Sequence, residues 1–154
     1  NIFEDKYKLN CLVSIVSLLN ISIIEGQIIR GIYNSTNKII NLISERDNWL
    51  IDYFLYLLNL LKLIGYEIDF KNNNSFKFLD LSTLQFVNNY SNTAIVFPHD
   101  LLNKSKKINY ESVDSFFKIF EQILQNHHLN NMNLHIPTNY LKFKKIILEF
   151  LSKK

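Results

Sequence analysis

Histidine is the residue type of this chain best suited to catalysis or metal binding, and it occurs four times, as His99, His127, His128 and His135. A catalytic metal centre needs about three ligands held on a fixed frame. His127 and His128 are adjacent, so on a helix their side chains point about 100° apart and do not easily share one ion. The sequence also has no His-Glu-x-x-His motif. We therefore interpret this pair as the frayed polar end of a helix.

Asp100 directly follows His99, and the two side chains could form an acid–base pair. A simpler interpretation makes Asp100 the N-cap of a short helix, where its carboxylate meets free backbone N–H groups. The sequence contains no P-loop, no dinucleotide-binding glycine motif and no nucleophile elbow. We therefore predict that the chain is not an enzyme and takes no cofactor. The alternative is a small metal-dependent hydrolase that uses His99, Asp100, His127 and His128, and metal analysis of the protein distinguishes the two.

Two lysine clusters could contact the phosphates of nucleic acid. Lys104, Lys106 and Lys107 lie close together, and five further lysines occupy the C-terminal end of the chain: Lys142, Lys144, Lys145, Lys153 and Lys154. The net charge is only +3 and arginine, the better phosphate ligand, occurs twice. A solvated helix face explains the same lysines without any ligand. An exposed Tyr or Phe beside them would favour contact with single-stranded nucleic acid.

Composition indicates one globular domain, because the 154 residues are 47% hydrophobic and 20% charged. The 3 glycines and 2 prolines favour helices over a sandwich rich in turns. Cys11 is the single cysteine, so the chain has no internal disulfide, and we expect its thiol to be buried in an apolar run. No signal peptide and no stretch of ~20 apolar residues is visible, so we predict a cytoplasmic protein without a membrane span. The first residue is Asn1 instead of Met, as expected for a piece of a longer protein.

The first two helices are predicted at about 5–20 and from 32 to about 43. The first is amphipathic, with apolar residues at helical spacing expected to face the core: Leu9, Leu12, Val13, Val16 and Leu19. Polar residues are expected on its solvent face: Lys6, Asn10, Ser14 and Ser17. In the second helix, isoleucines at positions 32, 39, 40 and 43 are expected to face inward.

The third helix, predicted at about 48–64, differs from its neighbours because it is apolar on nearly every side. Its only polar residues between 49 and 64 are Asp52, Asn59 and Lys62, which fall within an arc of roughly 80°. Other elements must therefore cover most of this helix. Gly65 is well placed to end it, since a left-handed residue at that position suits glycine.

The second half of the chain is predicted to contain a small β-hairpin and two more helices. Alternating residues at 76–78 and 84–87 predict the hairpin, 94–97 a further short strand, and 100–104 a short helix. A cap at or near Ser112 begins a fourth helix with an apolar stripe, and Pro137 and Thr138 begin the last one. The predicted fold is therefore mainly α: a single-domain helical bundle, residues 1–154, with a small β-hairpin insertion.

Three stretches, taken in order, resemble the C-terminal helical domain of RecO, the bacterial recombination-mediator family. The first is Glu25-Gly26-Gln27 followed by Gly31-Ile32-Tyr33, the second is the leucine-rich helix ending Gly65-Tyr66 and continuing to Phe70, and the third is Ile136-Pro137 before a basic helix. Their order and spacing fit along almost the whole chain. The resemblance implies a role in DNA repair: displacing single-strand-binding protein and, with RecR, loading the RecA recombinase.

The chain departs from this family pattern in two places. Many members carry a four-cysteine zinc module after the Gly-Tyr helix, but residues 71–90 contain no cysteine, so we expect the hairpin to stand without metal. The family tends to have arginine where this chain has Leu55, a position associated with docking the acidic tail of single-strand-binding protein. The family's DNA-binding OB-fold precedes this domain, so we expect it to lie outside the chain, in a cytoplasmic, nucleoid-associated bacterial protein.

Lysines are the residues that we expect to meet the partners. Lys62 is a candidate because it lies on the only polar strip of the third helix, and Lys142 and Lys145 because they could form a basic face. The loop lysines Lys104 and Lys106, together with Lys107, are candidates for DNA contact. A purely structural helical module of an unrelated assembly remains a further alternative.

Overall fold

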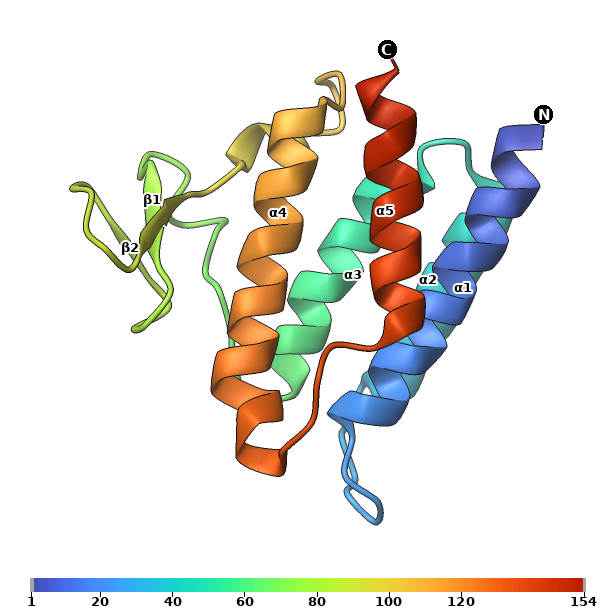
Figure 1. The fold of residues 1–154 in the computed structure, drawn as a ribbon, viewed down its shortest axis with the longest axis horizontal. Coiled ribbons are helices and arrows are strands. Elements are labelled where there is room, and N and C mark those ends of the chain that lie inside the picture. Colours follow the sequence, from blue (N-terminus) through green and yellow to red (C-terminus); the bar gives the residue numbers. More distant parts are fainter. Residues whose placement is uncertain (1, 154) are drawn as a thin grey trace.

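A computed structural model describes residues 2–153, and the side chains of residues 5–153. Five α-helices carry the fold: α1 (Ile2–Ser22), α2 (Ile32–Glu45), α3 (Trp49–Leu63), α4 (Tyr110–Ile123) and α5 (Thr138–Ser152). Three short strands follow α3: β1 (Phe78–Asp80), β2 (Gln85–Val87) and β3 (Ala94–Val96). Two 3₁₀ helices, η1 (His99–Leu102) and η3 (Asn130–Met132), and one π-helical turn, η2 (Leu124–Leu129), complete the chain. The predicted helical bundle with a small β insertion is confirmed (Figure 1).

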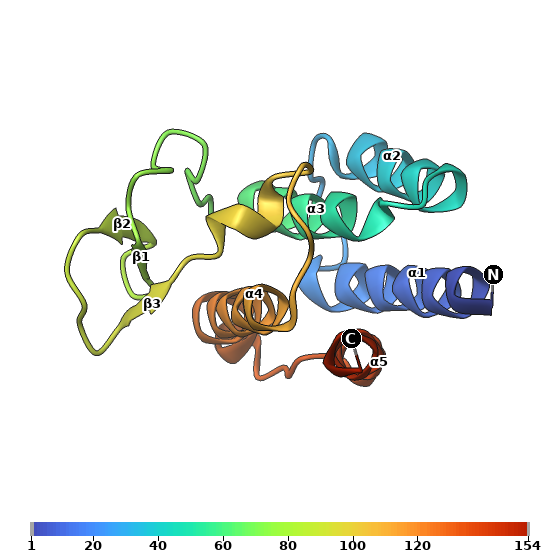
Figure 2. The same ribbon diagram turned by 90° about the horizontal axis from the view of Figure 1, so that it is seen from above.

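Helix α3 is the centre of the bundle, as its sequence predicted. It packs against α2, α4 and η1, and Figure 2 shows α2 beside it with α1, α4 and α5 on its other side. Ten of its 15 residues are buried: Trp49, Ile51, Asp52, Tyr53, Phe54, Tyr56, Leu57, Leu58, Leu60 and Leu61. Burial of these apolar side chains stabilises the packing of α3 in the bundle.

Gly65 ends α3 in the way its position predicted, with a φ of 109° that suits glycine. Two backbone hydrogen bonds close the helix end, from Gly65 N to Lys62 O (3.1 Å) and from Tyr66 N to Leu61 O (2.8 Å). This is the Schellman arrangement, which satisfies carbonyls that the helix leaves free. It sends the chain sharply away from the bundle toward the β insertion.

The predicted inward face of α1 is wrong. Leu9, Val13 and Val16 are 63%, 41% and 55% exposed, whereas the predicted solvent-facing Ser14 is fully buried. Apolar residues occur all around α1, so the sequence pattern does not select a face, and packing against α5 decides it. The face that packs inward carries Cys11, Ile15 and Leu18. Ser14 satisfies its hydroxyl by a hydrogen bond to the Tyr53 hydroxyl at 3.1 Å.

The expected burial of Cys11 is confirmed, and burial raises the pKa of its thiol well above the usual value. In α2, Ile39 and Ile43 are buried as predicted, but Ile40 is 37% exposed and so does not face the core.

The predicted hairpin is confirmed, and the third strand joins it in one antiparallel sheet with the order β2-β1-β3. Leu79 of β1 is opposite Phe86 and Ile95 on its two neighbours, while Phe78 is opposite Val87 and Val96. Figure 1 shows the sheet to one side of the bundle, beside α4.

Helix α4 begins earlier than predicted, because Asn109 and not Ser112 is its N-cap. The Asn109 side chain accepts a hydrogen bond from Ser112 N at 2.9 Å, so Ser112 lies inside the first turn. The predicted apolar stripe is confirmed, since all of its members are buried: Val113, Phe116, Phe117, Phe120, Ile123 and Leu124. The short helix predicted at 100–104 is the 3₁₀ helix η1, but the prediction that Asp100 is its N-cap is wrong. Pro98 holds that position, and Asp100 lies inside the helix, where its carboxylate pairs with Lys106.

Two buried tyrosines make a matched pair for a stability test. The Tyr140 hydroxyl has no hydrogen-bond partner among the described residues, and burial raises its pKa. The Tyr53 hydroxyl is equally buried but pairs with Ser14. Because a buried unpaired polar group is costly, Tyr140→Phe is expected to raise the free energy of unfolding by about 1 kcal/mol. Tyr53→Phe is expected to lower it by about 1–2 kcal/mol, since it leaves the buried Ser14 hydroxyl unpaired.

Equilibrium unfolding in urea measures both effects. Equal destabilisation by the two substitutions would contradict the assignment of the unpaired hydroxyl to Tyr140.

Candidate functional site

A hollow of about 550 Å³ opens where the C-terminal end of α5 meets the start of α3 and the loop at 103–109. Its apolar lining includes Leu50, Ile108, Phe150 and Leu151, with buried Trp49 beneath them. Three lysines line the same hollow: Lys104, Lys106 and Lys107. The volume is in the range of ~300–1,000 Å³ typical of pockets that bind small ligands or a peptide side chain.

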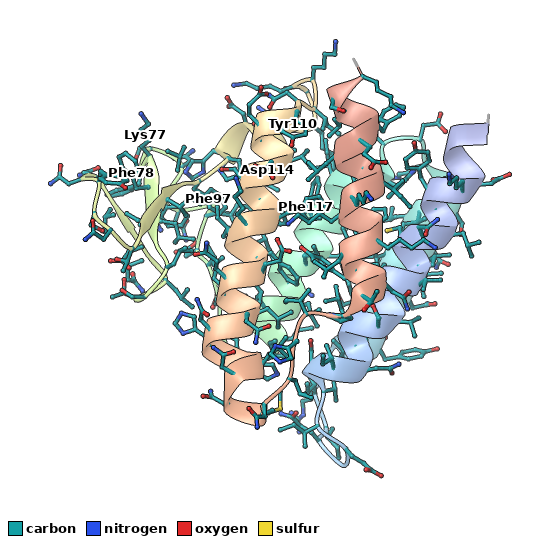
Figure 3. All side chains as sticks on the ribbon, in the orientation of Figure 1. Lys77, Phe78, Phe97, Tyr110, Asp114 and Phe117 are labelled. Atoms are coloured by element: carbon teal, nitrogen blue, oxygen red, sulfur yellow. The ribbon has the colours of Figure 1, made fainter. Side chains whose placement is uncertain are left out.

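Two further hollows continue from the first around α5. The second shares Lys107, Ile108 and Leu151 with the first and adds Tyr110, and the third adds Leu141, Lys145 and Leu148 from α5. We call these three joined hollows the α5 groove. Tyr110 is 39% exposed and lies at the start of α4, beside the end of α5, as Figure 3 shows.

Two of the three loop lysines form ion pairs inside the chain. Lys104 Nζ lies 2.7 Å from Asp52 Oδ1, and Arg46 lies 3.8 Å from the other oxygen of this carboxylate, which is only 8% exposed. Lys106 pairs with Asp100 on the surface. Lys107 is exposed and forms no ion pair with any described residue, so its charge remains available to a ligand.

The lysines expected to bind partners do not lie together. Lys145 lines the α5 groove, with its Nζ 3.9 Å from Glu149. Lys142 is exposed on the same helix but does not line the groove. Lys62 is at the end of α3, where it pairs with Glu67 at 3.0 Å. Of these three lysines, only Lys145 lines the groove. The sequence did not predict the groove's apolar floor, because residues from α3, α5 and the loop meet only after folding.

A smaller hollow of about 390 Å³ lies between α2 and α3, and Leu55 lines it. Lys38 supplies a positive charge there, so a basic side chain from α2 lines the same hollow as Leu55 of α3. Polar contacts join the two helices beside this hollow, from Asn59 Nδ2 to Ser35 Oγ (2.7 Å) and between the Thr36 and Tyr56 hydroxyls (3.1 Å).

The interpretation of His127 and His128 as a frayed helix end is wrong. They lie in η2, where His127 Nε2 donates to Leu81 O at 2.7 Å and His128 Nε2 donates to Ser22 O at 2.8 Å. The Tyr66 hydroxyl donates to His127 O at 2.8 Å and lies 3.2 Å from His128 Nδ1. We call this cluster the Tyr66 junction. It joins the ends of α1 and α3, the β insertion and η2.

The other groups considered for metal chemistry are also engaged in the fold. His99 Nε2 donates to Phe76 O at 2.7 Å, and Asp100 pairs with Lys106. Within residues 5–153, no three His, Cys, Asp or Glu side chains are placed to hold one metal ion. None of the described helices is both long enough and apolar enough to cross a membrane.

In a comparison with protein families, the model described as recombination protein O C terminal matches residues 4–133. The match spans α1 to η3 and includes the first two stretches on which the resemblance was based. The third stretch and α5 lie beyond it. Among curated proteins and among solved structures, none matches the chain.

Proposed function

Because the chain belongs to the family of RecO C-terminal domains, we propose that it is the non-catalytic partner-binding domain of a RecO-like recombination mediator. The family match supports a role in DNA recombination and repair. The proposed activity is to assist RecA loading on single-stranded DNA together with RecR. The proposed partners are RecR and single-strand-binding protein, as the resemblance implies, and an OB-fold outside this chain makes the main contact with DNA.

The α5 groove is the proposed docking site for the acidic tail of single-strand-binding protein. Its apolar floor at Leu50, Ile108 and Leu151 can take a bulky apolar side chain, and Lys107 and Lys145 can attract acidic residues beside it. The observation that carries this proposal is Lys107, an exposed lysine without an ion-pair partner among the described residues, at the point where two hollows join that share Ile108 and Leu151.

Titration of the tail peptide and of RecR against the 154-residue chain tests this proposal. Binding in the micromolar range is expected for the wild type, and Lys107→Glu is expected to weaken the tail peptide about five- to tenfold, because it reverses a charge on the rim of the groove. Lys142→Glu is the matched control, since this exposed lysine of α5 does not line the groove.

Two results would contradict this proposal. Failure of both partners to bind at tens of micromolar would refute the partner assignment. If Lys38→Glu weakens binding of the tail peptide and Lys107→Glu does not, the tail binds in the hollow between α2 and α3 instead of the α5 groove.

A further inference from the structure

The outer face of the small sheet carries an apolar row that no described element covers fully. Phe78 is opposite Val87 on one neighbouring strand and Val96 on the other, and directly opposed residues project to the same face of a sheet. Val96 is 44% exposed. The alternate row of Leu79, Phe86 and Ile95 packs with the core, and Leu79 is fully buried.

Tyr90, in the loop after β2, stands against this outer row and is 74% exposed. Its ring meets Phe78 edge to face, with centroids 6.1 Å apart and ring planes at 70°. In such a pair one ring directs its edge at the other, so ring faces remain open for a further stacking partner. Figure 3 places Phe78 on the side of the sheet away from α4, whereas Phe97 lies toward α4.

A cation lies beside this aromatic pair. Lys77 Nζ is 5.5 Å from the Phe78 ring centroid, and Lys77 forms no ion pair with any described residue. Asp80, the acidic residue of β1, is engaged elsewhere, because its Oδ1 accepts hydrogen bonds from Ser82 N (2.8 Å) and Ser82 Oγ (2.6 Å). These hydrogen bonds from Ser82 lower the pKa of the Asp80 carboxyl and hold it in its own turn. Lys77 is therefore free to meet an external anion.

We propose that Tyr90, Phe78 and Lys77 form a binding site for single-stranded nucleic acid. Tyr90 stacks on a base, Phe78 holds the Tyr90 ring in place, and Lys77 neutralises the adjoining phosphate. Aromatic rings next to lysine are the usual means of binding single strands without sequence preference. Strands of three residues offer too little apolar area for a stable protein interface, which buries about 800 Å² on each partner.

This site goes beyond the proposed function, because it gives the helical domain a DNA contact of its own, separate from the α5 groove. It also differs from the contact expected at Lys104, Lys106 and Lys107. There, two lysines already pair with carboxylates, and the neighbouring Tyr110 is 39% exposed, compared with 74% for Tyr90.

Fluorescence anisotropy of labelled oligothymidylate, titrated with the 154-residue chain at low salt, tests the proposal. Tyr90→Ala is expected to raise the dissociation constant by roughly 5- to 100-fold, the measured range for loss of one base-stacking ring. Tyr90→Phe keeps the ring and is expected to bind within about twofold of the wild type. Lys77→Gln is expected to weaken binding and to reduce the slope of log K against log salt by about 0.7.

Tyr33→Ala is the matched control, because Tyr33 is 78% exposed but begins α2, remote in sequence from the sheet. Circular dichroism confirms that each variant is folded. The proposal is overturned if the chain does not bind the oligonucleotide at low salt, if Tyr90→Ala binds as tightly as the wild type, or if Tyr33→Ala weakens binding equally. Failure of the RecR and tail-peptide titrations leaves this test unaffected, because the α5 groove and the sheet share no residue.

Discussion

Phe54→Ala is expected to lower the free energy of unfolding by about 3–5 kcal/mol, the usual cost of removing a buried phenylalanine ring. Phe54 is fully buried in α3, and its ring contacts two rings of α4, with centroid distances of 4.6 Å to Phe116 and 5.5 Å to Phe117. The substitution therefore leaves a cavity at the junction between the central helix and α4. Since domains of this size are stable by only about 5–15 kcal/mol, this loss is a large fraction of the total stability.

Guanidinium unfolding followed by circular dichroism measures this loss. Leu9→Ala is the control, because Leu9 is 63% exposed on α1, and we expect it to change stability by no more than about 0.5 kcal/mol. A large loss for Leu9→Ala would mean that the exposed and buried faces of α1 are exchanged, as the sequence pattern alone predicted.

His128→Ala is expected to cost about 2–3 kcal/mol, because it takes a hydrogen-bond donor from a buried backbone carbonyl. The imidazole donates to Ser22 O and contacts the Tyr66 hydroxyl, and Ser22 is itself fully buried. The substitution removes the hydrogen bond by which the Tyr66 junction reaches α1. Thermal unfolding measures the effect.

His135→Ala is the matched histidine control, since His135 is exposed after η3. It is expected to be neutral within about 0.5 kcal/mol. Equal losses for the two variants would show that His128 contributes no more than a surface residue. A double substitution of His128 and Tyr66 measures their coupling directly.

The sequence predicted the central helix because its composition leaves no choice. A helix with three polar residues in a narrow arc must be surrounded, and Gly65 after it is suited to the left-handed conformation that ends a helix. The inward face of α1 could not be predicted in the same way. Its apolar residues run around the helix, so long-range packing against α5 selects Ile15 and Leu18 over Leu9 and Val16.

Prediction of the candidate site is limited in the same way, because long-range contacts decide which residues meet there. Lysine positions are visible in a sequence, and Lys107 and Lys145 do reach the α5 groove. The sequence does not show which lysines pair with a carboxylate, because the partners can be far apart: Lys104 pairs with Asp52, 52 residues away. The structural role of His127 and His128 was mispredicted for a related reason. The carbonyl partners of His127 and His128 lie 46 and 106 residues away, beyond the reach of any local pattern.

The Tyr66 junction also bears on the order in which the chain folds. Its contacts close loops of 46 to 106 residues, whereas the helices that flank it depend on contacts a few residues apart. Closing long loops has an entropic cost that must be met before the contact is formed. We therefore expect the junction to form late in folding. Substitutions of Tyr66 or His128 are then expected to speed unfolding more than they slow folding.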